Sequence, residues 1–329
     1  MNNCLLADIG GTRARFALLS GSQIGPIESM MTGAYANAGD AIRHFLNGQD
    51  NVGNVDRAVL ACAGPVEGGR CALTNASWVL ESDELKRTFR WRTVDIVNDL
   101  EALAWAVPGF GPEDVRSIGH HNAVVGQPVA LIAPGTGLGM ACFVPGSGRA
   151  SVMASEGGHA TLAASDEHEA AIIEILRRRF GHVSAERVLS GGGLLNLYAA
   201  LGDGHGGSDG PLHTPEQVTR AALDGRSPRA RAALDLFCAF LGSVAGNAAL
   251  MFRARGGVLI GGGIVPRIAD HLPQTSFRAR FESKGRLSHY LAGIPTGVIV
   301  RSEPTFVGLK VLARACGGAP PADGTVDER

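Results

Sequence analysis

Short apolar runs that end at glycines or at a polar pair are the dominant pattern of this chain. The first run, residues 4–7, leads into Asp8-Ile9-Gly10-Gly11-Thr12, and residues 14–19 then alternate well enough for a second strand. A strand, a glycine-rich turn and a strand predict a β-hairpin. Such a turn leaves backbone N–H groups free for phosphates, and Asp8 beside it suits Mg²⁺, which prefers carboxylate, water and phosphate oxygens. An ordinary hairpin turn without a ligand explains the same residues equally well.

A second run, residues 94–97, ends at Asn98 and Asp99 and is followed by helically spaced apolar positions from Leu100 to Val107. A carboxylate where a buried strand gives way to a helix lies at the carboxyl edge of a sheet, where open α/β folds bind ligands. Asp99 can there accept a proton from a substrate hydroxyl, and Asn98 can orient that hydroxyl. The alternative is that one of the two simply caps the helix, because both residue types are preferred N-caps.

The second half of the chain opens in the same way as the first. The apolar run 129–133 enters Pro134-Gly135-Thr136-Gly137-Leu138-Gly139, and residues 140–144 return to apolar positions. This weak internal repeat predicts two related halves with a cleft between them and phosphates bound from both sides. The glycines run into a strand rather than a helix, so they do not match a Rossmann fingerprint, and no P-loop motif occurs. Residues 108–112, PGFGP, form the candidate hinge.

Three further segments carry candidate ligand-binding groups. Glu156 and His159 flank two glycines, so both side chains can converge on one polar ligand, and Glu186 falls in a helix start or a loop. Solvated surface charge is the alternative for all three. Gly261-Gly262-Gly263 follow the apolar run 257–260 and precede a helix expected at 264–272, a pattern that lets a flat ring such as adenine lie on the backbone. Generic packing of a strand against a helix explains these glycines as well.

The remaining apolar spacing predicts helices at 170–180, 228–253 and 304–315. The apolar segment 232–252 contains Asp235, Asn247 and many small residues, so we interpret it as a packed interdomain or dimer helix and not as a membrane span. The Gly/Asp/His-rich loop at 202–211 and the tail from residue 317 are expected to be mobile and disordered, respectively.

Composition excludes several classes of protein. The formal net charge is −1, which gives no electrostatic case for binding nucleic acid or an anionic membrane. The six cysteines are scattered without zinc-site spacing, which favours buried reduced thiols in a cytoplasmic protein. Nothing near the N-terminus resembles a signal peptide. The 46 glycines, about twice the usual share, cluster at strand-to-turn junctions and suggest backbone brought close to ligands.

Taken in order, six motifs resemble the bacterial ATP-dependent glucokinase family of the hexokinase/actin/Hsp70 superfamily. They are DIGGTRARFALL, IVNDLEA, APGTGLG, EGGH, HVSAERVLSGGGL and GGVLIGGGIVPR, and the resemblance covers the chain from about residue 4 to 315. The resemblance implies an α/β fold of two ribonuclease-H-like (actin-like ATPase) domains with a cleft between them. We expect a small domain of residues 1–110 plus 301–329 and a large domain of residues 111–300.

The resemblance also implies a role for each matching residue. Asp99 is expected to be the catalytic base, and Asp8 is expected to hold Mg²⁺ through water. The expected sugar ligands are Asn98, Asp99, Glu156, His159 and Glu186. The expected ATP-binding residues are Ala7, Asp8, Ile9, Gly10, Gly11 and Thr12 in the first phosphate loop, Gly135, Thr136 and Gly137 in the second, and Gly261, Gly262 and Gly263 beside adenosine.

The implied activity is Mg²⁺-dependent transfer of the terminal phosphate of ATP to the 6-hydroxyl of glucose, the first step of glycolysis, by a cytoplasmic homodimer without nucleic-acid or membrane partners. Two alternatives stay open at this point. One is a kinase for another hexose, because hydroxyl geometry is not visible in a sequence. The other is a nucleotide-switched ATPase of the actin/Hsp70 type, which shares the phosphate loops but has no use for convergent sugar ligands.

Overall fold

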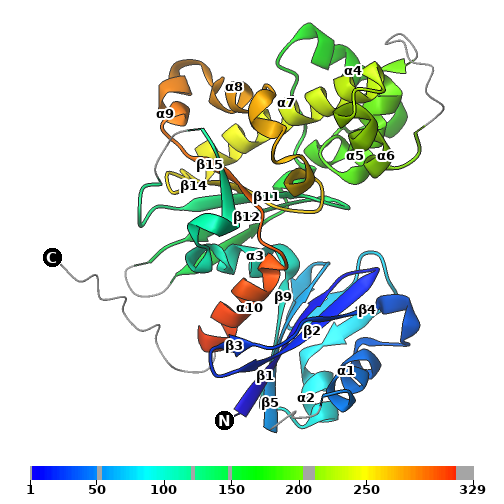
Figure 1. Cartoon of the computed structure of the whole chain (residues 1–329), viewed down its shortest axis with the longest axis vertical. Helices are drawn as coiled ribbons and strands as arrows, with labels where there is room; N and C mark the ends of the chain where they lie inside the picture. Colours follow the sequence, from blue (N-terminus) through cyan, green and yellow to red (C-terminus); the bar gives the residue numbers. More distant parts are fainter. Residues whose placement is uncertain (1, 50–53, 120–122, 147–149, 203–211, 316–329) are drawn as a thin grey trace, which may run out of the picture. The chain divides into compact units, whose positions relative to one another are not determined.

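The computed structural model describes residues 2–49, 54–119, 123–146, 150–202 and 212–315. Contacts within the chain separate it into two compact units (Figure 1): unit 1 is Met1–Phe110 with Ser302–Arg329, and unit 2 is Gly111–Arg301. Most of the loop at 202–211 and the tail from residue 317 lie outside the described residues. The expected mixed α/β class is confirmed in both units.

Unit 1 is built on a mixed sheet that begins with the expected hairpin. Strands β1 (Asn2–Ile9) and β2 (Arg13–Ser20) pair antiparallel, with Asp8 opposite Arg15. β5 (Asn54–Cys62) and β9 (Thr93–Asn98) extend the sheet in parallel, giving the order β3-β2-β1-β5-β9 with β4 also on β2. The short strands are β3 (Gln23–Ile24), β4 (Glu28–Met31) and a separate sheet of β6 (Val66–Glu67), β7 (Arg70–Ala72) and β8 (Val79–Glu81).

Helices cover both faces of the sheet of unit 1 (Figure 1). Successive residues of β1 alternate between the faces: Leu5 packs with Ile42 and Phe45 of α1, while Leu6 packs with Phe306 of α10. The helices are α1 (Ala38–Asn47), α2 (Ser82–Phe89), α3 (Asp99–Trp105) and α10 (Pro304–Ala315), with 3₁₀ turns at Thr32–Ala34 and Val107–Gly109. The last helix of the described chain therefore completes the core of the first unit.

Unit 2 contains the second expected hairpin, β11 (Val129–Pro134) with β12 (Leu138–Val144), inside a second mixed sheet of order β10-β15-β14-β11-β12-β13. The other strands are β10 (Val115–Ile118), β13 (Ser151–Ser155), β14 (Gly257–Ile260) and β15 (Thr296–Ile299). The helices are α4 (Glu167–Phe180), α5 (Gly191–Ala200), α6 (Pro215–Leu223), α7 (Pro228–Met251), α8 (Phe277–Glu282) and α9 (Ser288–Ala292). Short 3₁₀ turns are Pro112–Asp114, Gly157–His159, Ala185–Arg187, Val265–Ile268, Leu272–Gln274 and Gly285–Leu287.

The long helix α7 is the central core helix of unit 2. It is long and apolar enough to cross a membrane, but 78% of its most apolar window is buried inside the protein. A Cβ on Gly242 would lie 2.1 Å from the carbonyl oxygen of Phe277, so the small residues allow α8 to pack directly on its backbone. α7 packs in the core of unit 2 itself. It therefore has a role within one domain, which the interpretation as an interdomain or dimer helix did not include.

One expected element is wrong. The helix predicted at 264–272 is a 3₁₀ turn, Val265–Ile268, followed by a second, Leu272–Gln274. Pro266 and Pro273 stand near the starts of these turns, and a proline has no backbone N–H to donate to an α-helical ladder.

Candidate active site

The junction between β9 and α3 shows which of the two residues, Asn98 or Asp99, caps the helix. Asn98 is the N-cap: its Oδ1 accepts hydrogen bonds from the backbone N–H of Leu100 (2.9 Å) and Glu101 (3.4 Å). Its Nδ2 donates to the carbonyl oxygen of Gly64 at 3.1 Å, so the whole amide is oriented by unit 1. Capping by Asn98 fixes the start of the helix and places Asp99 as its first residue.

Asp99 is half-buried, and its Oδ1 accepts a hydrogen bond from the backbone N–H of Leu100 at 2.8 Å. Burial raises the pKa of Asp99, and the hydrogen bonds from backbone N–H groups and the Asn98 side chain oppose that rise. A carboxylate that is more basic than usual, at the carboxyl end of a strand, has the properties of a general base at neutral pH.

Asp8 lies at the end of β1 with its carboxylate in an ion pair. Its Oδ2 is 3.1 Å from Nη1 of Arg15, and Nε of Arg15 is 3.2 Å from Oε2 of Glu303. Burial raises the pKa of Asp8 to about 6; Arg15 opposes the rise, and the nearby carboxylates of Asp99 and Glu303 add to it. Asp99 thus lies close enough to Asp8 to raise its pKa, and the two carboxylates are neighbours within unit 1.

Sequence reasoning did not single out Arg15 or Glu303. The signal for Arg15 is the hairpin register, since the residue opposite Asp8 follows from the turn. Glu303 comes from the far end of the chain, and its left-handed backbone (φ 49°) directly precedes α10. Nothing in its local sequence indicates a partner almost 290 residues away.

The first glycine turn is closed by a hydrogen bond from Gly10 N to the carbonyl oxygen of Arg13 (2.9 Å). A Cβ on Gly11 would lie 2.8 Å from the Cβ of Asn75, so glycine is needed for this approach. Within the described residues, the N–H groups of Gly11 and Thr12 have no hydrogen-bond partner. Such a turn can bind phosphate oxygens.

Two of the expected ATP-binding residues have side chains that face the core. Ala7 and Ile9 are fully buried in unit 1, so they can contribute only backbone groups to a ligand. Their neighbours Asp8 and Gly10 are partly exposed. Because successive side chains of a strand point to opposite faces, the buried positions 7 and 9 alternate with the more exposed positions 8 and 10.

The second glycine turn lies in unit 2 and is closed by Gly135 N donating to the carbonyl oxygen of Gly137 (2.8 Å). Thr136 at its tip is exposed. Gly191 N, at the start of α5, donates to the carbonyl oxygen of Gly135 (2.9 Å), which joins the turn to a helix N-terminus. Both features favour anions.

The three glycines at 261–263 adjoin the same strand end as this turn. Gly261 N donates to the carbonyl oxygen of Ile132 (2.9 Å). Gly262 has a left-handed backbone (φ 84°), and a Cβ there would lie 2.2 Å from the carbonyl oxygen of Pro134. Gly263 has open space at its Cβ position, so backbone is accessible beside the turn.

Glu156, His159 and Glu186 are brought together in unit 2. Nε2 of His159 is 3.9 Å from Oε2 of Glu156, and its Nδ1 is 4.0 Å from Oε1 of Glu186. Glu186 lies in a 3₁₀ turn, and its Oε2 accepts a hydrogen bond from Leu138 N (2.9 Å) directly after the glycine turn. The three side chains thus form one polar cluster beside the Gly135–Gly137 turn.

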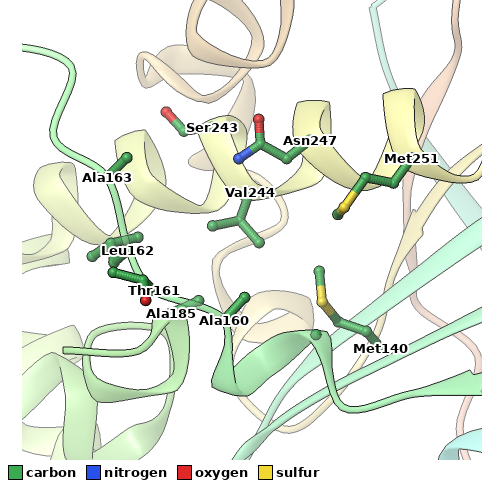
Figure 2. Close-up of a pocket in the computed structure, with 11 residues that line it drawn as sticks. Met140, Ala160, Thr161, Leu162, Ala163, Ala185, Ser243, Val244, Asn247 and Met251 are labelled. Atoms are coloured by element: carbon green, nitrogen blue, oxygen red, sulfur yellow. The ribbon is translucent and has the colours of Figure 1, made fainter. Parts of the chain in front are cut away.

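Gly158 allows the Glu156–His159 segment to approach the hairpin. It is buried, and a Cβ there would lie 2.0 Å from the carbonyl oxygen of Leu138. Next to this segment is a pocket between β12 and α7 (Figure 2), lined mainly by apolar groups such as Met140, Val244 and Met251. None of the described residues that line the pocket is charged, so its chemistry does not suit phosphate.

Among the described residues, no three His, Cys, Asp or Glu side chains lie close enough together to bind a metal ion. Mg²⁺ in nucleotide sites is usually bound by one or two carboxylates together with phosphates and waters. Asp8, beside a turn with available N–H groups, fits that requirement.

Comparisons with known proteins identify the family of this chain. The glucokinase family model matches residues 5–316. Glucokinase from Paramagnetospirillum magneticum is 43% identical over 313 residues, 94% of this chain and 96% of that protein. Glucokinase from Caulobacter sp. is 42% identical over 319 residues, covering 96% of each.

A solved structure is similar over nearly the same length. The crystal structure of glucokinase from an Antarctic psychrotroph has a TM-score of 0.86 and 34% identity, covering 96% of this chain and 99% of that one. The family resemblance expected from the six sequence motifs is therefore confirmed. This chain belongs to the glucokinase family.

Proposed function

We propose that this chain transfers the γ-phosphoryl group of ATP to the 6-hydroxyl of glucose, giving glucose 6-phosphate and ADP. Membership of the glucokinase family supports the reaction. The structural observation that carries the mechanism is the half-buried Asp99, which is oriented by the capped start of α3.

Asp99 acts as the general base in this proposal. Its carboxylate accepts the proton of the 6-hydroxyl while that oxygen attacks the γ-phosphorus and ADP leaves on the opposite side. Asn98 orients the sugar with the amide N–H that is not donated to Gly64. Phosphoryl transfer depends mainly on positioning and on stabilisation of charge, with general-base help added to these.

We assign Mg²⁺ to Asp8, acting through a bound water. When bound, the metal neutralises charge on the phosphate oxygens. Arg15 fixes the rotamer of the Asp8 carboxylate through their 3.1 Å contact. The free N–H groups of Gly11 and Thr12 bind phosphate oxygens beside it.

In unit 2 we assign Glu156, His159 and Glu186 to hydroxyl groups of the sugar. Carboxylate oxygens accept, and imidazole can donate or accept, so this group can bind several hydroxyls at once. The Gly135–Gly137 turn is assigned to phosphates, and the Gly261–Gly263 segment to adenosine. We further propose that residues of both units bind the substrates and that the protein is a cytoplasmic homodimer.

The direct test is an assay of ADP release with glucose, mannose, fructose, galactose and N-acetylglucosamine, each with and without Mg²⁺. We expect turnover to be highest with glucose and to require the metal. A higher kcat/KM for another sugar would reassign the substrate within the hexose kinases.

Thermal unfolding with single ligands separates a kinase from a nucleotide-switched ATPase. Glucose alone should raise Tm, since a ligand that binds only the native state stabilises it. A response to nucleotide alone, together with sugar-independent ATP hydrolysis, would instead support the switch.

A further inference from the structure

Two buried thiols of unit 1 contact each other behind the proposed catalytic edge. Cys62 is the last residue of β5, and Cys71 is the middle residue of β7; both are fully buried. Both side chains belong to the same buried cluster of unit 1, and a hydrogen bond between the two thiols shifts the pKa of each. The Sγ of Cys62 also lies 3.5 Å from the carbonyl oxygen of Val97. Cys62 and Cys71 are nine residues apart in the sequence, and the fold brings their side chains together.

Residues that contact the two thiols also contact Asn98, at the end of β9. Cys62 is opposite Asn98 in the β5–β9 register. A Cβ on Gly64 would lie 3.1 Å from the Sγ of Cys71 and 2.5 Å from the carbonyl oxygen of Ala72, so the Gly64 peptide packs tightly against β7. The carbonyl oxygen of the same Gly64 accepts the hydrogen bond from Asn98 Nδ2.

From this geometry we infer that Cys62 and Cys71 form a reversible disulfide, and that the disulfide weakens glucose binding through Gly64 and Asn98. The inference about binding rests on the proposed function; the inference about the disulfide does not. The oxidant is a low-molecular-mass disulfide such as oxidised glutathione.

The exchange has two balanced steps. The Cys71 thiolate attacks the small disulfide, forming a mixed disulfide and releasing one small thiolate. Cys62 loses its proton and attacks the Cys71 sulfur, forming the internal bond and releasing the second small thiolate. The two protons lost by the protein are taken up by the released thiolates, and two electrons pass from the protein to the small disulfide.

The two thiols differ in the way this order requires. The hydrogen bond from Cys62 lowers the pKa of Cys71, whereas that interaction and burial raise the pKa of Cys62. A thiolate is the attacking species in exchange, and we assign the first attack to Cys71 because it lies on the short strand β7.

The small sheet that carries Cys71 provides both the movement and the access. An S–S bond of about 2.05 Å is much shorter than a thiol–thiol hydrogen bond, so one strand must move when the disulfide forms. β5 is held between β1 and β9, while β6, β7 and β8 have only two or three residues each. Small sheets of this kind open locally at low cost, which admits the oxidant. As β7 moves toward β5, the tightly packed Gly64 peptide must shift, and Asn98 loses its fixed orientation.

The experiment equilibrates the full chain in defined ratios of reduced to oxidised glutathione, followed by acid quenching, alkylation and peptide mapping by mass. We expect a linked peptide pair that contains Cys62 and Cys71 and is 2 Da lighter than the reduced pair, because two hydrogens are lost. In parallel we expect KM for glucose to rise about five-fold, the effect of losing one hydrogen bond, and dithiothreitol to restore it.

Cys71→Ala and Cys62→Ala should each abolish the rise in KM, and Cys4→Ala, in the core on the other face of the sheet, is the matched control that should keep it. Failure to detect the linked pair at any ratio of reduced to oxidised glutathione, after equilibration, would overturn the disulfide. A linked pair with unchanged KM would overturn its coupling to Asn98. Mapping of the wild-type chain decides the disulfide even where a variant does not fold, and it does so independently of kinase activity.

Discussion

The two units use the same hairpin, but they supply its carboxylate in different ways. In unit 1, the strand before the glycine turn contains Asp8, and the returning strand places Arg15 opposite it. In unit 2, the corresponding positions are Ala133 and Gly139. The carboxylate beside this second turn is Glu186, which comes from a separate 3₁₀ turn and accepts the Leu138 N–H.

A repeated turn can thus be adapted to two tasks by changing the residues that flank it. In unit 1, burial raises the pKa of both Asp8 and Asp99, which is consistent with the roles proposed for them in the reaction. In unit 2, Glu156 is 88% exposed and Glu186 is 32% exposed, as suits groups that bind and release a polar substrate. We therefore expect substitutions in unit 1 to affect kcat and those in unit 2 to affect KM.

Asp99→Asn should produce the largest effect. The variant keeps an oxygen that can accept the Leu100 N–H but cannot take a proton, so kcat should fall by about 10²–10⁴-fold, with KM for glucose changed only slightly. Steady-state kinetics checks this. Glu101→Gln removes a carboxylate two residues along the same helix and should retain near-normal kcat. A similar loss of kcat in both variants would show that Asp99 acts through general charge and not as the base.

Asp8→Asn should come next. Loss of the negative charge should raise the Mg²⁺ concentration needed for half-maximal activity by about 10–100-fold, as for other groups that act through metal-bound water. Titration of activity and of ligand-induced Tm against Mg²⁺ measures the change.

Asp95→Asn, on the same sheet, is the control for Asp8→Asn and should leave the Mg²⁺ requirement unchanged. An unchanged requirement in Asp8→Asn itself would remove the metal from unit 1 and abolish the contrast between the hairpins.

Glu186→Gln should increase KM for glucose about ten-fold with little change in kcat, because hydrogen bonds to a charged group contribute roughly 1.5–3 kcal/mol. Glu156→Gln should have a smaller effect, since the Glu156 side chain is far more exposed. Equal effects on kcat and on kcat/KM would place Glu186 in the chemical step and contradict the division between the units.

Gly158→Ala should have the smallest effect on catalysis but a measurable effect on stability. The added methyl would meet the carbonyl oxygen of Leu138, and overpacking of this kind costs about 1–3 kcal/mol. Chemical denaturation measures the loss. Gly33→Ala, where the Cβ position is open, is the control and should be close to neutral.

The parts predicted from sequence are those set by local pattern. Glycines between apolar runs predicted both hairpins, and the polar pair after residues 94–97 predicted the β9–α3 junction. The helix at 264–272 failed because apolar spacing outweighed two prolines in the interpretation. Asn98 was left open between cap and ligand, because both interpretations use the same amide and only its hydrogen-bond partners distinguish them.

The parts that could not be predicted depend on contacts between distant segments. Glu303 reaches Arg15, and Glu186 reaches Leu138 N, through the tertiary fold alone. The contact of Cys62 with Cys71 likewise requires the small sheet to fold back over β5, which the short strands at 66–81 do not indicate on their own.

The placement of α10 has a consequence for folding during synthesis on the ribosome. Phe306, Leu309 and Leu312 cover the face of the first sheet that presents Leu6 and Val59. Those apolar side chains stay uncovered until residue 315 has been synthesised, by which time unit 2 has been made in full. Unit 1, whose translation begins first, can thus complete its fold only after the whole of unit 2 has been synthesised, and in the interval its exposed face is open to chaperones and to aggregation.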